Sequence, residues 1–280
     1  MKFEQTQVFN FDGALRGMRN PMNSWAKSDS SFGIYCEHES SKEAHEVAWA
    51  WVNYLLKNEE SSGDLEQDSL RRDELFDKYL SWLYSNGMNY LPQDHHYTAN
   101  YIGPNDMDLC RRLINGGSEH RKFLRQIMVS VDITAPLYWW KEFDTYKVGT
   151  TANSTSTMHK LASTPITLDC FETDDYCGDL VYFTHDGDTL TDHTVDSIMQ
   201  GLIEDLELLR QKYNETKDKR YWKELIRLLP NGWLQTRTIT MNYENLRSMY
   251  HQREYHKLTE WHSFCDWVKT LPYAEELIIG

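Results

Sequence analysis

Apolar residues recur at helical spacing in several segments of the chain. Val47, Trp51 and Leu55 fall at four-residue intervals and predict an amphipathic helix over residues 41–56, with Ser41 as its cap. The same spacing predicts further helical segments at 73–87, which Gly87 would end, at 105–114 after Pro104, at 137–147, at about 194–213 and from Asn242 onward. Most of the predicted secondary structure is therefore helical.

Alternating apolar and polar residues predict strands elsewhere. From residue 123 the alternation indicates a half-buried strand that ends at Pro136. Further strands are expected at 180–183, at 233–241 and near the start of the chain, where the apolar residues are Phe3, Val8, Phe9 and Phe11. Because helices and strands are mixed without regular β–α–β alternation, the pattern favours the α+β class.

No composition change divides the chain, so a single domain over residues 1–280 is expected. The two most polar stretches, 57–72 and 173–196, are interpreted as surface excursions because the apolar pattern resumes on both sides of each. A third polar segment, 17–31, is rich in turn formers and carries Arg19 and Lys27. A surface loop is the more common explanation of such a segment, and a loop that folds over an anionic ligand is the alternative.

The charge of the chain limits its partners. The 29 basic and 43 acidic side chains give a net charge of −14, which repels nucleic-acid backbones and anionic membranes. We therefore expect neither nucleic acid nor a membrane as a partner, and a phosphate-bearing ligand would need a local basic pocket. Aromatic residues make up 13% of the chain, which excludes a disordered protein.

The cysteines and the first residues indicate a cytoplasmic protein. The five cysteines are scattered and form no CxxC pair, which favours reduced thiols over disulfides or a zinc ribbon. No apolar run approaches the length of a membrane span, and the first residues lack the pattern of a signal peptide. Phosphate-loop, dinucleotide-fold, HExxH and GxSxG motifs are also absent.

Three segments in a fixed order carry a resemblance to a known family. They are LINGGSEH at 113–120, APLYWWKEFDTYKVGTTANSTSTMHKL at 135–161, and LLPNGWLQTRTITMNYENLRSMYHQREYHKLTEW at 228–261. Together they resemble the flavin-dependent thymidylate synthases, whose pattern they follow over about 113–280, whereas 1–112 matches none of its motifs. The matched positions are Glu119, His120, Pro136, the 149–156 loop, Leu229, Pro230, Asn242, Leu246, Arg253 and Glu260.

The signature of that family is altered here. Counted from Pro136, its Arg-His-Arg positions fall on Thr145, Tyr146 and Lys147, so only the last keeps a cation. The family uses these arginines for the diphosphate of the flavin dinucleotide and for the phosphate of the nucleotide. A lysine offers a point charge where an arginine offers a bidentate fork.

The resemblance implies a mixed sheet with long helices and a homotetramer that makes dTMP from dUMP. The implied cofactor is FAD, with NADPH and methylenetetrahydrofolate as co-substrates. Cofactor contacts are implied at Glu119, His120, Lys147, Asn153 and Asn242. Substrate contacts are implied at Ser156, His159, Lys160, Arg253, His256 and Glu260, with Arg253 as the catalytic residue that contacts the pyrimidine.

The residues themselves give partial support to these assignments. The 147–160 segment offers hydroxyl, amide, imidazole and lysine donors, which suit an anion, although such clusters are more often solvated loops. If one helix continues through residue 260, Arg253, His256 and Glu260 share a face with Met249, and an exposed salt bridge is the plainer explanation. Two alternatives to thymidylate synthesis stay open: a divergent relative that binds a pyrimidine nucleotide or flavin without catalysis, and another pyrimidine-modifying reaction.

Overall fold

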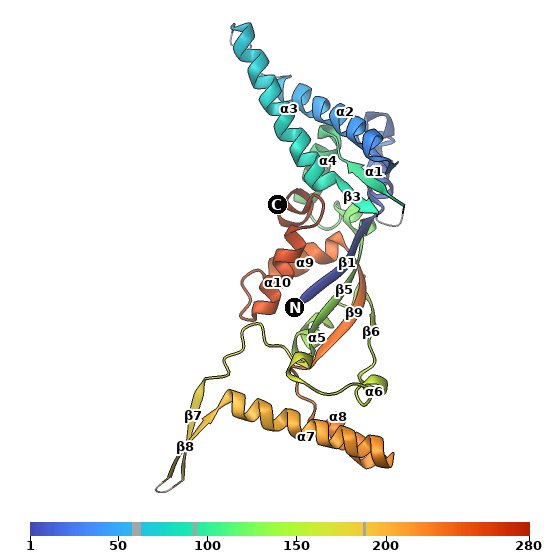
Figure 1. Ribbon diagram of the computed structural model, residues 1–280. Helices are drawn as coiled ribbons and strands as arrows, with labels where there is room; N and C mark the ends of the chain where they lie inside the picture. Colours follow the sequence, from blue (N-terminus) through green and yellow to red (C-terminus); the bar gives the residue numbers. More distant parts are fainter. Residues whose placement is uncertain (58–62, 92–93, 187–188) are drawn as a thin grey trace. The chain divides into compact units, whose positions relative to one another are not determined.

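The computed structural model describes residues 1–57, 63–91, 94–186 and 189–280, without the side chains of 159 and 182–193 (Figure 1). In the described part the chain forms two compact units, each assembled from segments that are distant in the sequence. Unit 1 consists of Met1–Thr6, Ser130–Thr240 and Lys257–Ser263, and unit 2 of Gln7–Val129, Met241–His256 and Phe264–Gly280. The single domain expected over residues 1–280 stays a prediction.

Unit 1 contains most of a four-stranded sheet with the order β1-β5-β9-β6 (Figure 1). The edge strand β6 pairs antiparallel with β9, so that Asn153 lies opposite Thr238 and Ser154 opposite Arg237. The elements wholly or mostly in this unit are β1 (Lys2–Phe9), β5 (Met128–Pro136), α5 (Leu137–Phe143), β6 (Thr151–Ser154), α6 (Thr157–Lys160), the 3₁₀ turn η4 (Leu168–Cys170), β7 (Val181–Asp186), β8 (Thr189–Thr194), α7 (Val195–Thr216), α8 (Lys219–Leu228) and β9 (Leu234–Asn242).

Unit 2 is mainly helical and carries an antiparallel three-stranded sheet with the order β2-β4-β3. Its helices α2 and α3 form an antiparallel hairpin (Figure 1). The elements wholly or mostly in this unit are α1 (Phe11–Arg19), the 3₁₀ turns η1 (Asn20–Met22) and η2 (Trp25–Lys27), β2 (Ser31–Tyr35), α2 (Glu37–Leu56), α3 (Leu65–Gly87), β3 (Met88–Leu91), β4 (His96–Tyr101), α4 (Pro104–Asn115), η3 (Lys122–Gln126), α9 (Tyr243–Arg253), α10 (Thr259–Lys269) and a final π-helix (Glu275–Ile279).

The α+β class is confirmed, as are most of the predicted elements. α4 begins at Pro104, and Thr194 caps α7 by accepting a hydrogen bond from the amide of Ser197 at 3.1 Å. The alternating pattern before Pro136 forms β5, although residues 122–126 belong to the 3₁₀ turn η3. Proline at a first helical position is a local signal, which explains why the sequence alone placed the start of α4, whereas α7 was predicted from its apolar stripe rather than from its cap.

Several predicted boundaries are wrong. α2 begins at Glu37 rather than after Ser41, because acidic residues in a first turn favour the positive end of the helix dipole. Phe11 lies in α1 rather than in the first strand, after Asn10 adopts a left-handed φ of 71°. α3 extends into the stretch interpreted as a polar excursion, because Asp64 caps it by accepting from the amides of the second and third residues beyond it.

The core of unit 2 contains a tyrosine that satisfies two backbone groups. Tyr273 is fully buried, and its hydroxyl donates to the carbonyl of Asn100 at 2.6 Å and accepts from the amide of Ile102 at 3.0 Å. Its ring makes edge contacts with Phe11 and Trp82. The C-terminal segment is therefore joined to the end of β4 by both packing and hydrogen bonds.

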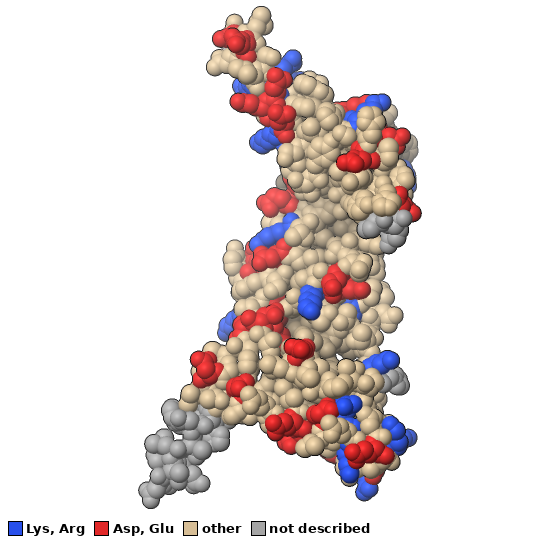
Figure 2. All heavy atoms as spheres, in the orientation of Figure 1, with Lys and Arg blue, Asp and Glu red and all other residues tan. Residues whose placement is uncertain are grey.

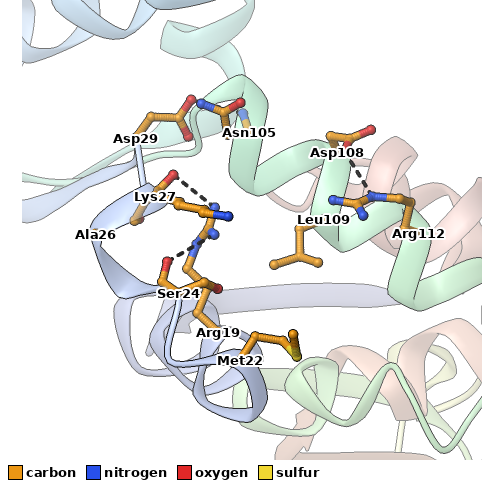
Figure 3. Close-up of a pocket in the computed structure, with 11 residues that line it drawn as sticks. Arg19, Met22, Ser24, Ala26, Lys27, Asp29, Asn105, Asp108, Leu109 and Arg112 are labelled. Atoms are coloured by element: carbon orange, nitrogen blue, oxygen red, sulfur yellow. Dashed lines mark hydrogen bonds and ion pairs between the residues drawn. The ribbon is translucent and has the colours of Figure 1, made fainter.

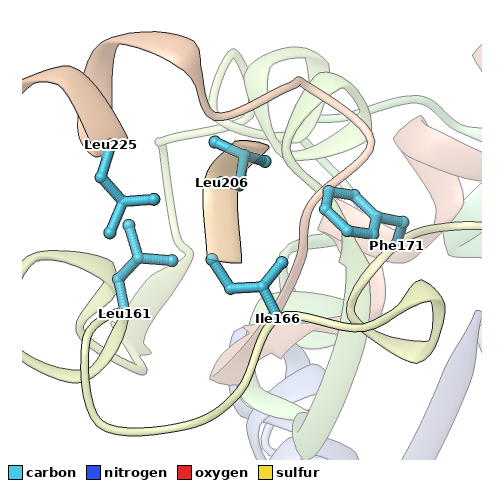
Figure 4. Packing of buried hydrophobic residues seen from close by; sticks show 5 residues of the cluster. All are labelled: Leu161, Ile166, Phe171, Leu206 and Leu225. Atoms are coloured by element: carbon cyan, nitrogen blue, oxygen red, sulfur yellow. The ribbon is translucent and has the colours of Figure 1, made fainter. Parts of the chain in front are cut away.

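Unit 1 has two groups of buried apolar side chains. Trp139 and Trp140 of α5 are fully buried, and Trp139 stacks on Phe143 and packs against Trp261. The second group joins α7 and α8 to the 161–171 segment. It contains Leu161, Ile166, Phe171, Leu206 and Leu225 (Figure 4). Over α7 and α8, acidic and basic side chains are interspersed on the face that Figure 2 shows.

A buried ion pair joins α1 to α4 in unit 2. Asp106 is fully buried, and its carboxylate accepts from Nε of Arg19 at 2.5 Å and from the hydroxyls of Ser28 and Ser30, each at 2.6 Å. Arg19 is 5% exposed, and its terminal nitrogens donate to two backbone carbonyls of the loop after α1. A charge so far from water is tolerated only when its hydrogen-bonding capacity is filled, as it is here.

We predict that Asp106→Asn lowers the free energy of unfolding by about 3–5 kcal/mol, because it leaves the buried guanidinium of Arg19 without a counter-charge. Urea denaturation followed by circular dichroism measures this change. The matched control is Asp108→Asn on the same helix, where an exposed pair with Arg112 contributes at most about 1 kcal/mol. Equal losses in the two variants would contradict the role assigned to the buried pair.

Candidate functional site

The altered signature positions follow directly after α5. The amides of Leu137 and Tyr138 donate to the carbonyls of Trp233 and Asn231 at 3.0 and 3.1 Å, which satisfies two of the donors that the start of a helix leaves unpaired. α5 ends at Phe143, and the amide of the following Asp144 donates to the carbonyl of Trp140 at 2.8 Å. The chain segment before β9 therefore sets the direction of α5 and of the turn that carries Thr145, Tyr146 and Lys147.

The segment expected to be a polar ligand loop is partly a strand. Residues 151–154 form β6 at the edge of the sheet, and all four are exposed. The amide of Thr155 continues this contact by donating to the carbonyl of Thr236 at 2.9 Å. The threonines of β9 and Thr151 of β6 suit a pleated surface, but only the pairing of these two strands over a long sequence separation makes this segment extended. The exposed edge strand presents hydroxyl, amide and backbone groups together.

Arg237 of β9 lies beside the altered signature, and reading the sequence did not single it out. Its Nη1 donates to Oδ1 of Asp144 at 2.7 Å, and its guanidinium carbon lies 4.2 Å from the ring centre of Trp140. The side chain is 14% exposed, against 48% for that of Asp144. The only sequence signal was one cation alternating with threonines, and nothing in it points to a partner 93 residues away.

The other proposed ligand residues of unit 1 lie on or next to this segment. Lys147 and Asn153 are exposed, and Ser156 is partly exposed. Lys160, at the end of α6, is also exposed, and its amide donates to the carbonyl of Ser156 at 3.0 Å. The side chain of His159 lies outside the described residues. Their predicted roles as ligand contacts stay predictions.

Glu119 and His120 lie in an exposed turn between α4 and η3 of unit 2. Glu119 is 77% exposed and forms an ion pair with Lys122 at 3.2 Å, and the hydrogen bond from that ammonium lowers the pKa of the carboxyl group. The ring of His120 lies over Gly116, where a Cβ would come within 3.2 Å of Cδ2. Glycine at this position therefore permits the close approach of the imidazole.

Asn242, assigned to the cofactor by the resemblance, has a structural role in unit 2. It caps α9: its side chain accepts from the amide of Asn245 at 3.0 Å, and the Asn245 side chain accepts in return from the amide of Asn242 at 3.3 Å. Two residues later, Glu244 pairs with Arg121 at 2.9 Å. The family that the sequence resembles has the pattern Asn-x-Arg-x-Leu, which falls on residues 242–246 and whose arginine corresponds to Glu244. That position therefore carries a carboxylate, and the cation beside it comes from another segment.

The expectation of one helix face for Arg253, His256 and Glu260 is wrong. α9 ends at Arg253, His256 lies in the following turn, and Glu260 is in the first turn of α10. The amide of His256 donates to the carbonyl of Arg253 at 3.0 Å, which closes that turn. The i+3 and i+7 spacing of the sequence was correct for a continuous helix, but the chain turns after residue 253. Arg253 and His256 are both partly buried in unit 2.

Glu260 is a buried group of unit 1. It is 5% exposed, and its Oε1 accepts a hydrogen bond from the hydroxyl of Tyr138. Burial, and next the bond to Glu260, raise the pKa of Tyr138 far above its usual value. Burial also raises the pKa of the nearby Glu172, with further contributions from the charges of Asp174 and Glu260. Glu260 therefore has a fixed partner on α5 that its sequence position did not indicate.

A cavity of about 610 Å³ lies between the 19–29 segment and α4 in unit 2 (Figure 3). Its wall carries both signs of charge: Lys27 and Arg112 as cations, and Asp29 and Asp108 as carboxylates. The carboxylate of Asp29 accepts from the first amides of α4 at 2.9 and 3.2 Å, so it already occupies the positive end of that helix. Burial raises the pKa of Asp29.

The segment expected as a plain loop at 17–31 is thus largely structured. It contains the end of α1 and the two 3₁₀ turns, and Nη1 and Nη2 of Arg19 donate to the carbonyls of Ser24 and Lys27 at 3.3 and 3.2 Å (Figure 3). Arg19 is therefore committed to the fold. Whether this segment covers an anionic ligand stays a prediction.

Two further properties of the described residues bear on function. None of their helices combines the length and the apolar character that crossing a bilayer requires. Among these same residues, no group of three or more histidine, cysteine, aspartate or glutamate side chains is arranged to hold a metal ion. The candidate residues of unit 1 include hydroxyls and the Lys147 ammonium, which are donors suited to phosphate oxygens.

Comparisons with known proteins bear on the fold. No family model matches the sequence, and no curated protein sequence matches it. Among solved structures, thymidylate synthase X (ThyX) of Helicobacter pylori with FAD and dUMP is similar over 99% of this chain and 97% of that chain, with 13% identity and a TM-score of 0.53.

Two further structures show weaker similarity. They are another Helicobacter pylori ThyX complex with FAD and dUMP (14% identity, 88% of this chain, 97% of that chain, TM-score 0.45) and the UMP/dUMP methylase PolB of Streptomyces cacaoi bound with 5-Br UMP (13%, 62%, 82%, 0.42). At 13% identity, the similarity to the first structure shows the fold alone. The chain shares the fold of a flavin-dependent thymidylate synthase, as the resemblance of its three segments predicts.

Proposed function

We propose that the protein is a flavin-dependent enzyme that binds a pyrimidine nucleotide and makes dTMP from dUMP, with methylenetetrahydrofolate and NADPH as co-substrates. The observation that carries this proposal is the similarity of fold over 99% of the chain to a protein solved with FAD and dUMP. The three matched segments support it, because they follow the order of the family pattern. Assembly as a homotetramer is part of the same proposal and rests on the resemblance alone.

The donor set of unit 1 fits the phosphate groups of such ligands. β6 exposes hydroxyls and the amide of Asn153 at one edge of the sheet, and the segment before it exposes the ammonium of Lys147. We propose that Lys147 and Asn153 contact the diphosphate of FAD, and that Ser156, His159 and Lys160 contact the nucleotide. When bound, FAD would supply the hydride chemistry, and these residues would hold and orient the phosphates.

In unit 2, we propose that Arg253 contacts the nucleotide base. Its guanidinium can offer two parallel donors to carbonyl oxygens, and it belongs to a turn closed by the amide of His256. Glu119, His120, Asn242, His256 and, in unit 1, Glu260 keep the roles that the resemblance assigns them only as proposals. Of these, Asn242 also has its capping role, and Glu260 is bonded to Tyr138.

The runner-up function is nucleotide or flavin binding without thymidylate synthesis. Thr145 and Tyr146 favour it, because they stand where the family has Arg-His and cannot supply a guanidinium fork to a diphosphate. Another modification of a pyrimidine nucleotide is a further alternative. Uptake of FAD separates a flavoprotein from a protein that binds only the nucleotide, and conversion of dUMP separates the enzyme from a relative that binds flavin without catalysis.

We predict that the purified protein binds FAD and dUMP. We also predict that it converts dUMP to dTMP when methylenetetrahydrofolate and NADPH are both present. Absorbance in the flavin region after addition of FAD and removal of the excess measures cofactor uptake. Conversion of dUMP, measured by chromatography, reports the reaction. A colourless protein that still binds dUMP in calorimetry would favour the runner-up, and binding of neither ligand would reject the proposed function.

Lys147→Ala is expected to weaken FAD or nucleotide binding by about 1.5–3 kcal/mol, the range for hydrogen bonds to charged groups. The reason is that Lys147 is the one cation kept at the three signature positions of an acidic chain. Titration calorimetry measures the effect. Lys212→Ala on α7, an exposed lysine paired with Glu215, controls for the loss of one positive charge from unit 1. Equal affinities in the two variants would remove Lys147 from the proposed site.

Arg253→Lys is expected to impair dUMP binding or turnover while the melting temperature stays close to that of the wild type. The substitution keeps the charge but removes the bidentate geometry. Calorimetry with dUMP and a thermal melt separate the two effects. Arg220→Lys, at an exposed pair with Asp218, should be silent in both measurements. Unchanged affinity and turnover in Arg253→Lys would show that this arginine has no ligand role.

A further inference from the structure

A chain of hydrogen bonds in unit 1 connects the end of α5 to the polar segment after β6. Nη1 of Arg237 donates to Asp144, and its Nε donates to Oε1 of Gln235 at 3.0 Å. Nε2 of Gln235 in turn donates to the carbonyl of Thr155 at 3.0 Å and to the hydroxyl of Thr157 at 3.3 Å. The turn with the altered signature and the proposed ligand segment are thus held from one side by β9.

The guanidinium of Arg237 is fixed in position by the group beneath it. It lies 4.2 Å from the ring centre of Trp140, which is fully buried. Trp140 is itself oriented by the bond from its Nε1 to the carbonyl of Gln235 at 2.9 Å. A cation–π contact of a largely desolvated arginine is stronger than one at an exposed site, and lysine cannot reproduce both the stacking and the fork.

Arg237 has one nitrogen left for a ligand. Its Nε and Nη1 are engaged, whereas Nη2 donates no hydrogen bond to any residue in the described part of the chain. Its Cα partner across the sheet is Ser154 of the exposed edge strand. Asp144, which accepts from Nη1, immediately precedes Thr145, the first signature position that has lost its arginine.

We propose that Arg237 is a positioning residue for a phosphate-bearing ligand, and that its guanidinium, supplied from β9, compensates for the arginine missing at position 145. It holds the 144–147 turn against the 151–157 segment and leaves Nη2 for an oxygen of the ligand. This inference rests on the proposed function and adds to it a residue that lies within the third matched segment but at none of its matched positions. Loss of Arg237 should therefore lower the affinity for the ligand while the protein stays folded.

The test compares Arg237→Gln with Arg210→Gln. Arg210 is a matched control because it lies in the same unit, is 13% exposed, and pairs with Glu207 at 2.6 Å while donating to the carbonyl of Ala162. Both variants lose a largely buried arginine that pairs with a carboxylate. Dissociation constants for FAD and dUMP, the melting temperature, and hydrogen exchange of the amides of residues 144–157 are measured in each.

For Arg237→Gln we expect affinity for at least one ligand to fall about tenfold or more, the equivalent of 1.4 kcal/mol, together with faster exchange over 144–157. Arg210→Gln should lower the melting temperature without either change. Arg237→Lys should not restore affinity, because it lacks the fork. Faster exchange with unchanged affinity, or no change in either, would overturn the proposal. If the wild-type protein binds neither ligand, the proposed function fails, and the assignment of Nη2 to a ligand oxygen fails with it. The hydrogen-exchange rates of residues 144–157 still test whether Arg237 holds the 144–147 turn against the 151–157 segment.

Discussion

The pairing of β9 with its neighbours is the constraint on which the structure of unit 1 depends. β9 lies between β5 and β6, and the carbonyls just before it receive the first amides of α5. Its side chains hold the end of α5 through Arg237 and the segment after β6 through Gln235. Because one strand contacts these parts, the placement of the end of α5 and of the 151–157 segment depends on the register of β9.

Two buried charges, one in each unit, are held in place by hydrogen-bonding partners. Asp106 has Arg19 and two serine hydroxyls, and Arg237 has Asp144, Gln235 and the face of Trp140. The two arginines differ in how many of their guanidinium nitrogens donate a hydrogen bond. The nitrogens of Arg19 are all committed to the fold, whereas Nη2 of Arg237 donates to nothing among the described residues. This difference separates an arginine that stabilises a unit from one suited to a ligand.

The fold and the chemistry of the family rest on different residues. The α+β arrangement depends on apolar patterning, proline and cap positions, which tolerate wide sequence change. Phosphate binding depends on a few cations with defined geometry, and two of the three signature positions have lost theirs. A chain can therefore keep the fold at 13% identity while its site changes in composition, as the Glu244 and Arg121 pair also illustrates.

The sequence alone determined the features that depend on neighbouring residues. The start of α4 near Pro104 and the end of β5 at Pro136 follow from the backbone preferences of proline, and a stripe of apolar residues predicted α7 from about residue 194. The tertiary structure decided the turn after Arg253, the strand at 151–154, the bond from Tyr138 to Glu260 and the place of Arg237 beside Asp144. These depend on contacts between residues far apart in the chain, and such contacts leave no periodic signal because each is made by a single pair of side chains or strands.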